Sequence, residues 1–241
     1  MQKIFKMSFI GFLSLILMFP AVAQETVKDS AQDSAQDSAQ DSVQESLIEN
    51  ANAAKLNQLL TSLETFQADF IQIITTETGE QLDKLSGQFS LKKPGKFNWE
   101  VMQPFAQVLI ADGKYLWQYD ADLEQAMVRD LDESLAGTPA QLLSGSLSEL
   151  QNIYQIEYNQ NEFEVFNLVP KQEGQFESIQ LSFKEGALRQ LRLVDTLGQT
   201  THVSFNNAKF GMALDNSLFI LKLEEGVELV DSRKYLATTD G

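Results

Sequence analysis

The chain has 241 residues, with 34 acidic against 18 basic side chains, a formal net charge of −16, one histidine and no cysteine. The absence of cysteine excludes disulfides, thiolate metal sites, thiol nucleophiles and a lipidated cysteine. A single histidine, His202, excludes metal motifs that need a histidine pair. The acidic excess argues against nucleic-acid binding, which needs a basic surface.

The N-terminal segment has the three parts of a secretory signal peptide. Lys3 and Lys6 precede an apolar run over residues 7–19, and Ala21-Val22-Ala23 provides a small-residue cleavage site. The apolar run is too short to cross a bilayer as a helix. We therefore predict a signal peptide over residues 1–23, cleaved after Ala23, and export of the mature chain.

An acidic spacer of low complexity follows over residues 24–46. It repeats Asp-Ser-Ala-Gln with a period of four between Asp29 and Ser42. In a helix these aspartates would repel one another at i,i+4, and the segment has little apolar bulk to offset the entropy of ordering. We predict a solvated spacer, followed by one folded domain over residues 47–241.

The domain is predicted to open with a helix over residues 47–64. Ser46 and Glu49 have the spacing of a capping box, which marks a helix start. Behind them, leucines recur at helical spacing and form an apolar stripe. These are Leu56, Leu59, Leu60 and Leu63.

The hydrophobic period then changes to two, which is typical of strands. The turn sequences Pro94-Gly95, Gln103-Pro104 and Asp112-Gly113 separate the alternating runs. The apolar members before the interruption are Phe66, Ala68, Phe70, Phe89, Leu91, Phe97, Trp99, Val101, Val108, Ile110, Tyr115, Trp117, Tyr119, Ala126 and Val128. Alternation resumes over residues 153–158, 163–169, 178–183, 187–194, 200–205 and 218–223. This order predicts an antiparallel meander.

A short helical insertion interrupts the meander. Thr138, Pro139 and Gln141 form one capping box, Gly145 ends that helix, and a second box begins at Ser146. The predicted fold is mainly β with helices: a single curved antiparallel sheet forming an incomplete β-barrel. The N-terminal helix and a central helical lid would cover it.

The concave face of such a sheet suggests an apolar cavity beneath the lid. The candidate lining residues are Phe70, Phe89, Leu91, Phe97 and Trp99 from the strands, with Leu142 and Leu143 from the lid. Periodicity does not distinguish a cavity from a core that these side chains fill themselves. Both interpretations remain open at this point.

Several segments are similar to a known family. The segment Gly87–Trp99 resembles a Lys-Arg-Pro…Phe-x-Trp segment, and Ala111–Asp120 resembles a second signature of the outer-membrane lipoprotein carrier (LolA) family. Thr138-Pro139 with Leu142-Leu143 is similar to the lid helix of that family, and Gly226–Arg233 to its closing segment. The resemblance covers about residues 50–235, and the spacer is not part of it.

The resemblance implies a periplasmic chaperone of a Gram-negative cell. It would receive triacylated lipoproteins from an inner-membrane ABC transporter complex and deliver them to an outer-membrane lipoprotein receptor. The implied fold is an incomplete β-barrel with a helical lid. We expect a monomer that is not an enzyme and needs no cofactor, metal or nucleic acid.

Lys93 departs from the family pattern. The family typically has arginine before this proline, and that arginine is thought to hold the lid closed through lid carbonyls. Lys93 can donate hydrogen bonds but lacks the planar fork of arginine. A weaker latch, one shared with Lys92, and an ordinary solvated lysine all remain open.

Three other classes are weighed against the carrier. The first is a related half-barrel lipid- or lipoprotein-binding sensor or receptor. The second is a secreted hydrolase that uses Asp120 and Asp122 as an acid–base pair, although their position between two strands favours a turn. The third is a structural surface protein with a filled core.

Overall fold

The structure is a computed structural model that describes residues 37–131, 143 and 150–233. The chain divides into two units, residues 1–48 and 49–241, and the second unit contains the sheet. The described helical elements are α2 (Asp37–Ser62), α5 (Leu150–Ile153) and the 3₁₀ turn η1 (Asn216–Phe219). Within the described ranges, every helix is too short or too polar to span a membrane.

Helix α2 begins at Asp37, before the predicted start, so the prediction of Ser46 as its N-cap was wrong. The final part of the expected spacer is helical because extending a helix costs less than nucleating one, and alanine, glutamine and glutamate favour it. The buried side chains of its second half are Ala53, Leu56 and Leu60, and Leu63 follows the helix. The predicted stripe is therefore the face that packs, except for the half-buried Leu59.

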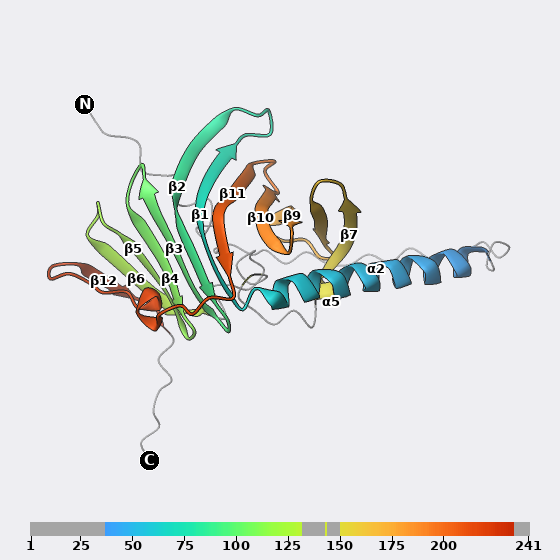
Figure 1. Ribbon diagram of the computed structural model, residues 1–241. Coiled ribbons are helices and arrows are strands. Elements are labelled where there is room, and N and C mark those ends of the chain that lie inside the picture. The colour runs from blue at the N-terminus through green and yellow to red at the C-terminus, as the bar shows by residue number, and fades with distance from the viewer. Residues whose placement is uncertain (1–36, 132–142, 144–149, 234–241) are drawn as a thin grey trace, which may run out of the picture. The chain divides into compact units, whose positions relative to one another are not determined.

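The described strands form one sheet (Figure 1). They are β1 (Thr65–Thr75), β2 (Gln81–Lys92), β3 (Lys96–Gln103), β4 (Gln107–Asp112), β5 (Tyr115–Asp120), β6 (Gln125–Asp130), β7 (Tyr154–Gln160), β8 (Glu164–Pro170), β9 (Phe176–Lys184), β10 (Ala187–Asp195), β11 (Thr200–Phe210) and β12 (Glu228–Asp231). Their order is β12-β6-β5-β4-β3-β2-β1-β11-β10-β9-β8-β7. The predicted single curved, open sheet with an N-terminal helix is confirmed. The residues expected to form the lid, apart from Leu143, lie outside the described ranges.

The inner face of the sheet is defined here as the face that carries Phe70, Phe89 and Trp99. Residues paired across antiparallel strands share a face, so the pairing of Phe70 with Phe205 extends the inner face from β1 to β11. The same pairing through β10, β9 and β8 adds Leu191, Leu181 and Phe166. All these side chains are buried. The main core thus lies along the inner face.

The outer face of β3, β4 and β5 has a small core of its own. The predicted strand over residues 218–223 was wrong: the Asp215 carboxylate accepts a hydrogen bond of 2.8 Å from the Ser217 amide and begins η1. Phe219 and Leu214 are buried there against Ile110. A short run of leucine and phenylalanine fits a strand or a helical turn, and the Asp215 cap decides between them.

Two strand side chains fix this C-terminal segment to the outer face. Lys92 donates hydrogen bonds of 2.9 Å to the Leu214 carbonyl and to Asn216 Oδ1. Asn98 donates one of 2.9 Å to the Leu218 carbonyl. The chain then adds β12, which pairs with β6 in the parallel sense. The segment therefore covers the outer face of strands whose other face carries the main core.

The backbone of β2 approaches β3 too closely for a side chain at Gly87. A Cβ atom placed there would lie 1.8 Å from the Glu100 carbonyl oxygen. The register of β2 and β3 shifts between Ser86 and Gly87, which is the signature of a β-bulge. Only glycine fits this position.

We expect Gly87→Ala to lower the free energy of unfolding by about 2–4 kcal/mol, since the added methyl group must push two strands apart. Urea unfolding followed by circular dichroism measures this change. Gly174→Ala is the matched control, because a Cβ atom at Gly174 meets nothing within 4 Å. Equal stability of the two variants would contradict the close approach.

Candidate functional site

Five aromatic side chains form a continuous cluster on the inner face. The ring centroids of Phe70 and Trp99 are 4.1 Å apart, and those of Phe89 and Trp99 are 5.2 Å apart. Phe205 lies 5.8 Å from Phe89 and 5.6 Å from Phe66. Each of these rings is at most 7% exposed. The cluster draws on β1, β2, β3 and β11, which makes it the densest aromatic feature described for the sheet.

Gly87 explains why two of these rings meet across an intervening strand. Phe70 lies on β1 and Trp99 on β3, and β2 separates the two strands. The residue of β2 that pairs with Phe70 is Gly87. Because this residue has no side chain, Phe70 and Trp99 can pack against each other above it. The same glycine therefore allows the strands to approach and the rings to touch.

The structure places the predicted strand residues together. Phe70, Phe89, Leu91, Phe97 and Trp99 all lie on the inner face and are buried. Leu143 is buried as well, whereas Leu142 lies outside the described residues. The rings contact one another, so their exposure to a ligand remains a prediction.

Sequence analysis did not single out Phe66 and Phe205 as members of this cluster. Both stand at inner-face positions of alternating runs, which was the available signal. Their contact depends on the pairing of β1 with β11, two strands far apart in the chain. Alternation reveals which face a residue occupies, but it does not reveal which distant strand lies beside it.

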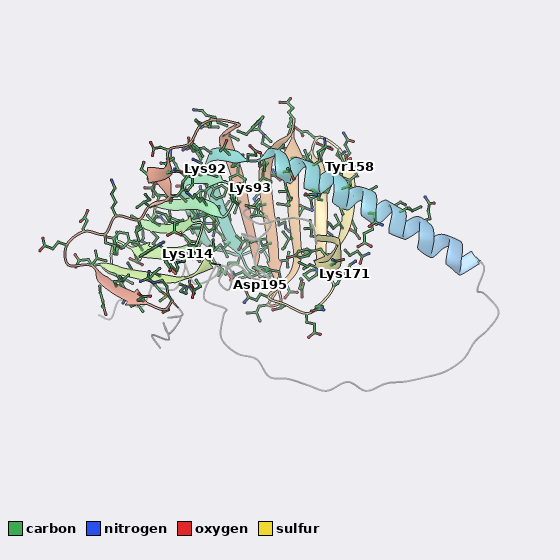
Figure 2. All side chains as sticks on the ribbon, turned by 90° about the horizontal axis from the view of Figure 1, so that it is seen from below. Lys92, Lys93, Lys114, Tyr158, Lys171 and Asp195 are labelled. Atoms are coloured by element: carbon green, nitrogen blue, oxygen red, sulfur yellow. The ribbon has the colours of Figure 1, made fainter. Side chains whose placement is uncertain are left out.

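Lys93 lies at the C-terminal end of α2 (Figure 2). Its ammonium donates a hydrogen bond of 2.8 Å to the Leu60 carbonyl, and its backbone N–H donates one of 2.8 Å to the Glu64 carbonyl. A lysine near the last carbonyls of a helix satisfies orphan acceptors and opposes the negative end of the dipole. Burial lowers the pKa of Lys93, while the Glu64 carboxylate opposes that shift. Lys93 is therefore a partly buried anchor between β2 and α2.

Lys92 binds a different segment of the chain. Its ammonium binds the C-terminal segment on the outer face, as described above. The hypothesis of a latch shared between Lys92 and Lys93 thus involves two side chains that bind different segments. The lid carbonyls that such a latch would require lie outside the described residues.

The second sequence signature forms the β4–β5 hairpin. The Asp112 carboxylate accepts hydrogen bonds of 2.8 Å from the amides of Lys114 and Tyr115 and one of 2.9 Å from Trp117 Nε1. Trp117 packs against the small outer core. This motif therefore builds the turn and the outer face rather than the aromatic cluster.

Neither acid–base candidate has the surroundings of a catalytic pair. Asp120 accepts hydrogen bonds from Gln107 (2.8 Å) and from the Leu123 amide (3.0 Å), and Asp122 is exposed in the same turn. His202 is half-buried on β11 and pairs with Arg192 of β10. Burial and the nearby Arg192 charge lower the pKa of His202. Among the described residues, no three acidic or histidine side chains gather as a metal site would require.

Comparison with known proteins places the chain in a family. Residues 61–222 match the family described as outer membrane lipoprotein carrier protein LolA. This chain belongs to the LolA family. The match extends from the end of α2 to residue 222, just after η1, so it includes every residue of the aromatic cluster.

Curated relatives agree with that assignment. The chain is 39% identical to an outer-membrane lipoprotein carrier protein of Azotobacter vinelandii over 178 residues, covering 73% of this chain and 86% of the relative. It is 39% identical to one of Chromohalobacter salexigens over 184 residues, covering 76% and 88%. A solved LolA superfamily protein of Nitrosomonas europaea matches with 12% identity and a TM-score of 0.44, covering 72% of this chain and 98% of that one.

We expect Lys93→Leu to lower the free energy of unfolding by about 1–3 kcal/mol, because the Leu60 carbonyl loses a charged donor. Lys84→Leu is the control, since Lys84 is exposed on β2, the strand that leads into Lys93. Thermal and urea unfolding measure both variants. A loss no larger for Lys93→Leu than for Lys84→Leu would contradict the anchor in this LolA family member.

Proposed function

We propose that this chain is a periplasmic lipoprotein chaperone. It binds the acyl chains of triacylated lipoproteins on the inner face and ferries them from an inner-membrane ABC transporter to an outer-membrane receptor. The observation that carries the proposal is the largely apolar inner face from β4 through β1 to β8 in a member of the LolA family. The signal-peptide pattern of residues 1–23 supports the periplasm as its compartment.

The free energy of hydrocarbon in water explains why such a carrier is needed. Exposing an acyl chain costs about 0.8 kcal/mol per methylene, so one chain of about 16 carbons costs on the order of 12 kcal/mol. Unassisted passage between membranes is therefore negligible. An inner face rich in phenylalanine and leucine supplies the apolar surface that replaces the bilayer during transit.

The carrier must also release its cargo. An inner face that bound acyl chains more tightly than the next acceptor would never unload. We propose that the central helical lid, with Leu142 and Leu143, closes against the empty inner face. Cargo must then displace these apolar contacts, which lowers its net affinity. The burial of Leu143 supports this role.

We propose Lys93 as the latch of that lid. The ammonium has three protons, and the described bond to the Leu60 carbonyl uses one of them. The remaining protons are available to carbonyls of a closed lid. The position of Lys93, at the junction of α2 and the β2–β3 turn, supports this assignment.

Purification of the full chain from the periplasm of a Gram-negative host tests the function directly. Mass spectrometry of the bound species is expected to detect triacylated polypeptides. Incubation with the outer-membrane receptor should then remove them, and Lys93→Leu should slow that release. Bound lipid without transfer would indicate a sensor or receptor instead, and the absence of acylated species would contradict the proposal.

The two tryptophans report on opposite faces and locate the binding site. Trp99 belongs to the inner cluster, and Trp117 packs against the outer core. We expect a synthetic triacylated lipopeptide to shift the emission of Trp99 in a Trp117→Phe variant. The matched Trp99→Phe variant, which retains only Trp117, should bind without an emission shift. Equal shifts in both variants would contradict binding at the inner face.

A further inference from the structure

One cation lies on the apolar inner face outside the aromatic cluster. Arg129 is on β6, where its register partner on β5 is Leu116. The pairing continues from Leu116 to Ala111 on β4 and from Ala111 to Phe97 on β3. Because paired residues share a face, Arg129 stands in one row with three buried apolar residues. Arg129 is the last residue of this row, so the row of apolar side chains ends with a charged one.

The neighbours of Arg129 along β6 confirm its direction. Val128 is buried on the outer face, where its register partner is Trp117. Asp130 pairs with Tyr115 and therefore also lies on the outer face. The adjacent carboxylate in the sequence thus points away from the inner face. Asp120, which shares the inner face on β5, pairs with Gln125 rather than with Arg129. Arg129 itself is half-buried.

The guanidinium has no acceptor within the described part of the chain. None of the hydrogen bonds or ion pairs found for the described residues involves the Arg129 side chain. Burial lowers the pKa of Arg129, yet a guanidinium remains protonated at neutral pH. A charge that is partly removed from water without a partner is unfavourable, and such a group is expected to find an acceptor when one is offered.

A ligand on the inner face would supply that acceptor. Arginine presents its donors in a planar fork, which matches two oxygen atoms or one carbonyl with two lone pairs. An acyl chain lying along the row from Phe97 to Leu116 would bring its polar end to Arg129. The chemistry required of that end is an oxygen acceptor, either a carboxylate or an ester or amide carbonyl.

We propose that Arg129 binds the oxygen acceptor at the polar end of an acyl-chain ligand on the inner face. This inference rests on the proposed function, because it names the part of the ligand that the protein recognises besides its hydrocarbon. Arg129 would set the direction in which the chain lies, with the hydrocarbon toward the aromatic cluster and the polar end toward β6.

Displacement of a fluorescent apolar dye from the full chain tests this role with three probes of equal chain length. Laurate offers a carboxylate, methyl laurate an ester carbonyl, and dodecane no acceptor. We expect Arg129→Gln to weaken laurate binding by about 10-fold or more and to leave dodecane binding within about two-fold. Arg129→Lys should recover part of the laurate affinity, since it keeps the charge but loses the fork.

Arg192→Gln is the matched control, because Arg192 lies on the outer face opposite the buried Leu191 and Leu193. It should leave the affinity for all three probes unchanged. If Arg129→Gln loses affinity for laurate alone, the site binds a carboxylate. If it loses affinity for both laurate and methyl laurate, the site binds an acyl carbonyl. Both results support the inference, and circular dichroism confirms that each variant is folded.

Two results would overturn the inference, and they differ in what they leave standing. Arg129→Gln could bind laurate as tightly as the unaltered protein does, or lose affinity for laurate and dodecane equally. Either result would mean that Arg129 does not bind the polar end of the ligand. The proposed function survives that result. If the unaltered protein displaces no dye with any probe, acyl-chain binding itself fails, and the inference fails with it.

Discussion

The close approach of β2 to β3 at Gly87 is the constraint on which the inner face depends. A side chain at this position would collide with the Glu100 carbonyl, and Phe70 and Trp99 contact each other across the strand that carries this glycine. The absence of a side chain at Gly87 therefore has two consequences. It lets the strands meet, and it leaves room for rings from β1 and β3 to pack into one cluster.

Both faces of β3, β4 and β5 pack against apolar side chains, but these come from different parts of the chain. The inner face carries the aromatic cluster and the row of Phe97, Ala111 and Leu116, whereas the C-terminal segment covers the outer face through Phe219 and Leu214. Lys92 and Asn98 hold that segment with hydrogen bonds to its carbonyls. The C-terminal segment therefore supports these strands from the outer side.

Under the proposed function, cargo binding and stability make opposite demands on the inner face. The rings of the cluster contact one another at 4.1–6.3 Å between centroids, which stabilises the empty protein. Under the proposed function, an acyl chain would replace some of these contacts or those of the proposed lid. The net affinity would then be a difference between two apolar packings, and such a difference suits a carrier that must unload.

The sequence by itself determined most of the strands, the inward residues of β1, β2 and β3, the family and the exclusion of cysteine and paired-histidine chemistry, because alternation and composition are local properties. In β4, β5 and β6 the alternating residues that it singled out, among them Ile110, Trp117 and Val128, lie on the outer face instead. It did not determine the start of α2 at Asp37 or the helical turn at Asn216, where local propensities compete. Only the tertiary structure decided that β1 lies beside β11, that Lys93 anchors α2, and that Arg129 ends an apolar row. These features depend on which distant strands pair, and strand pairing is a property of the whole fold.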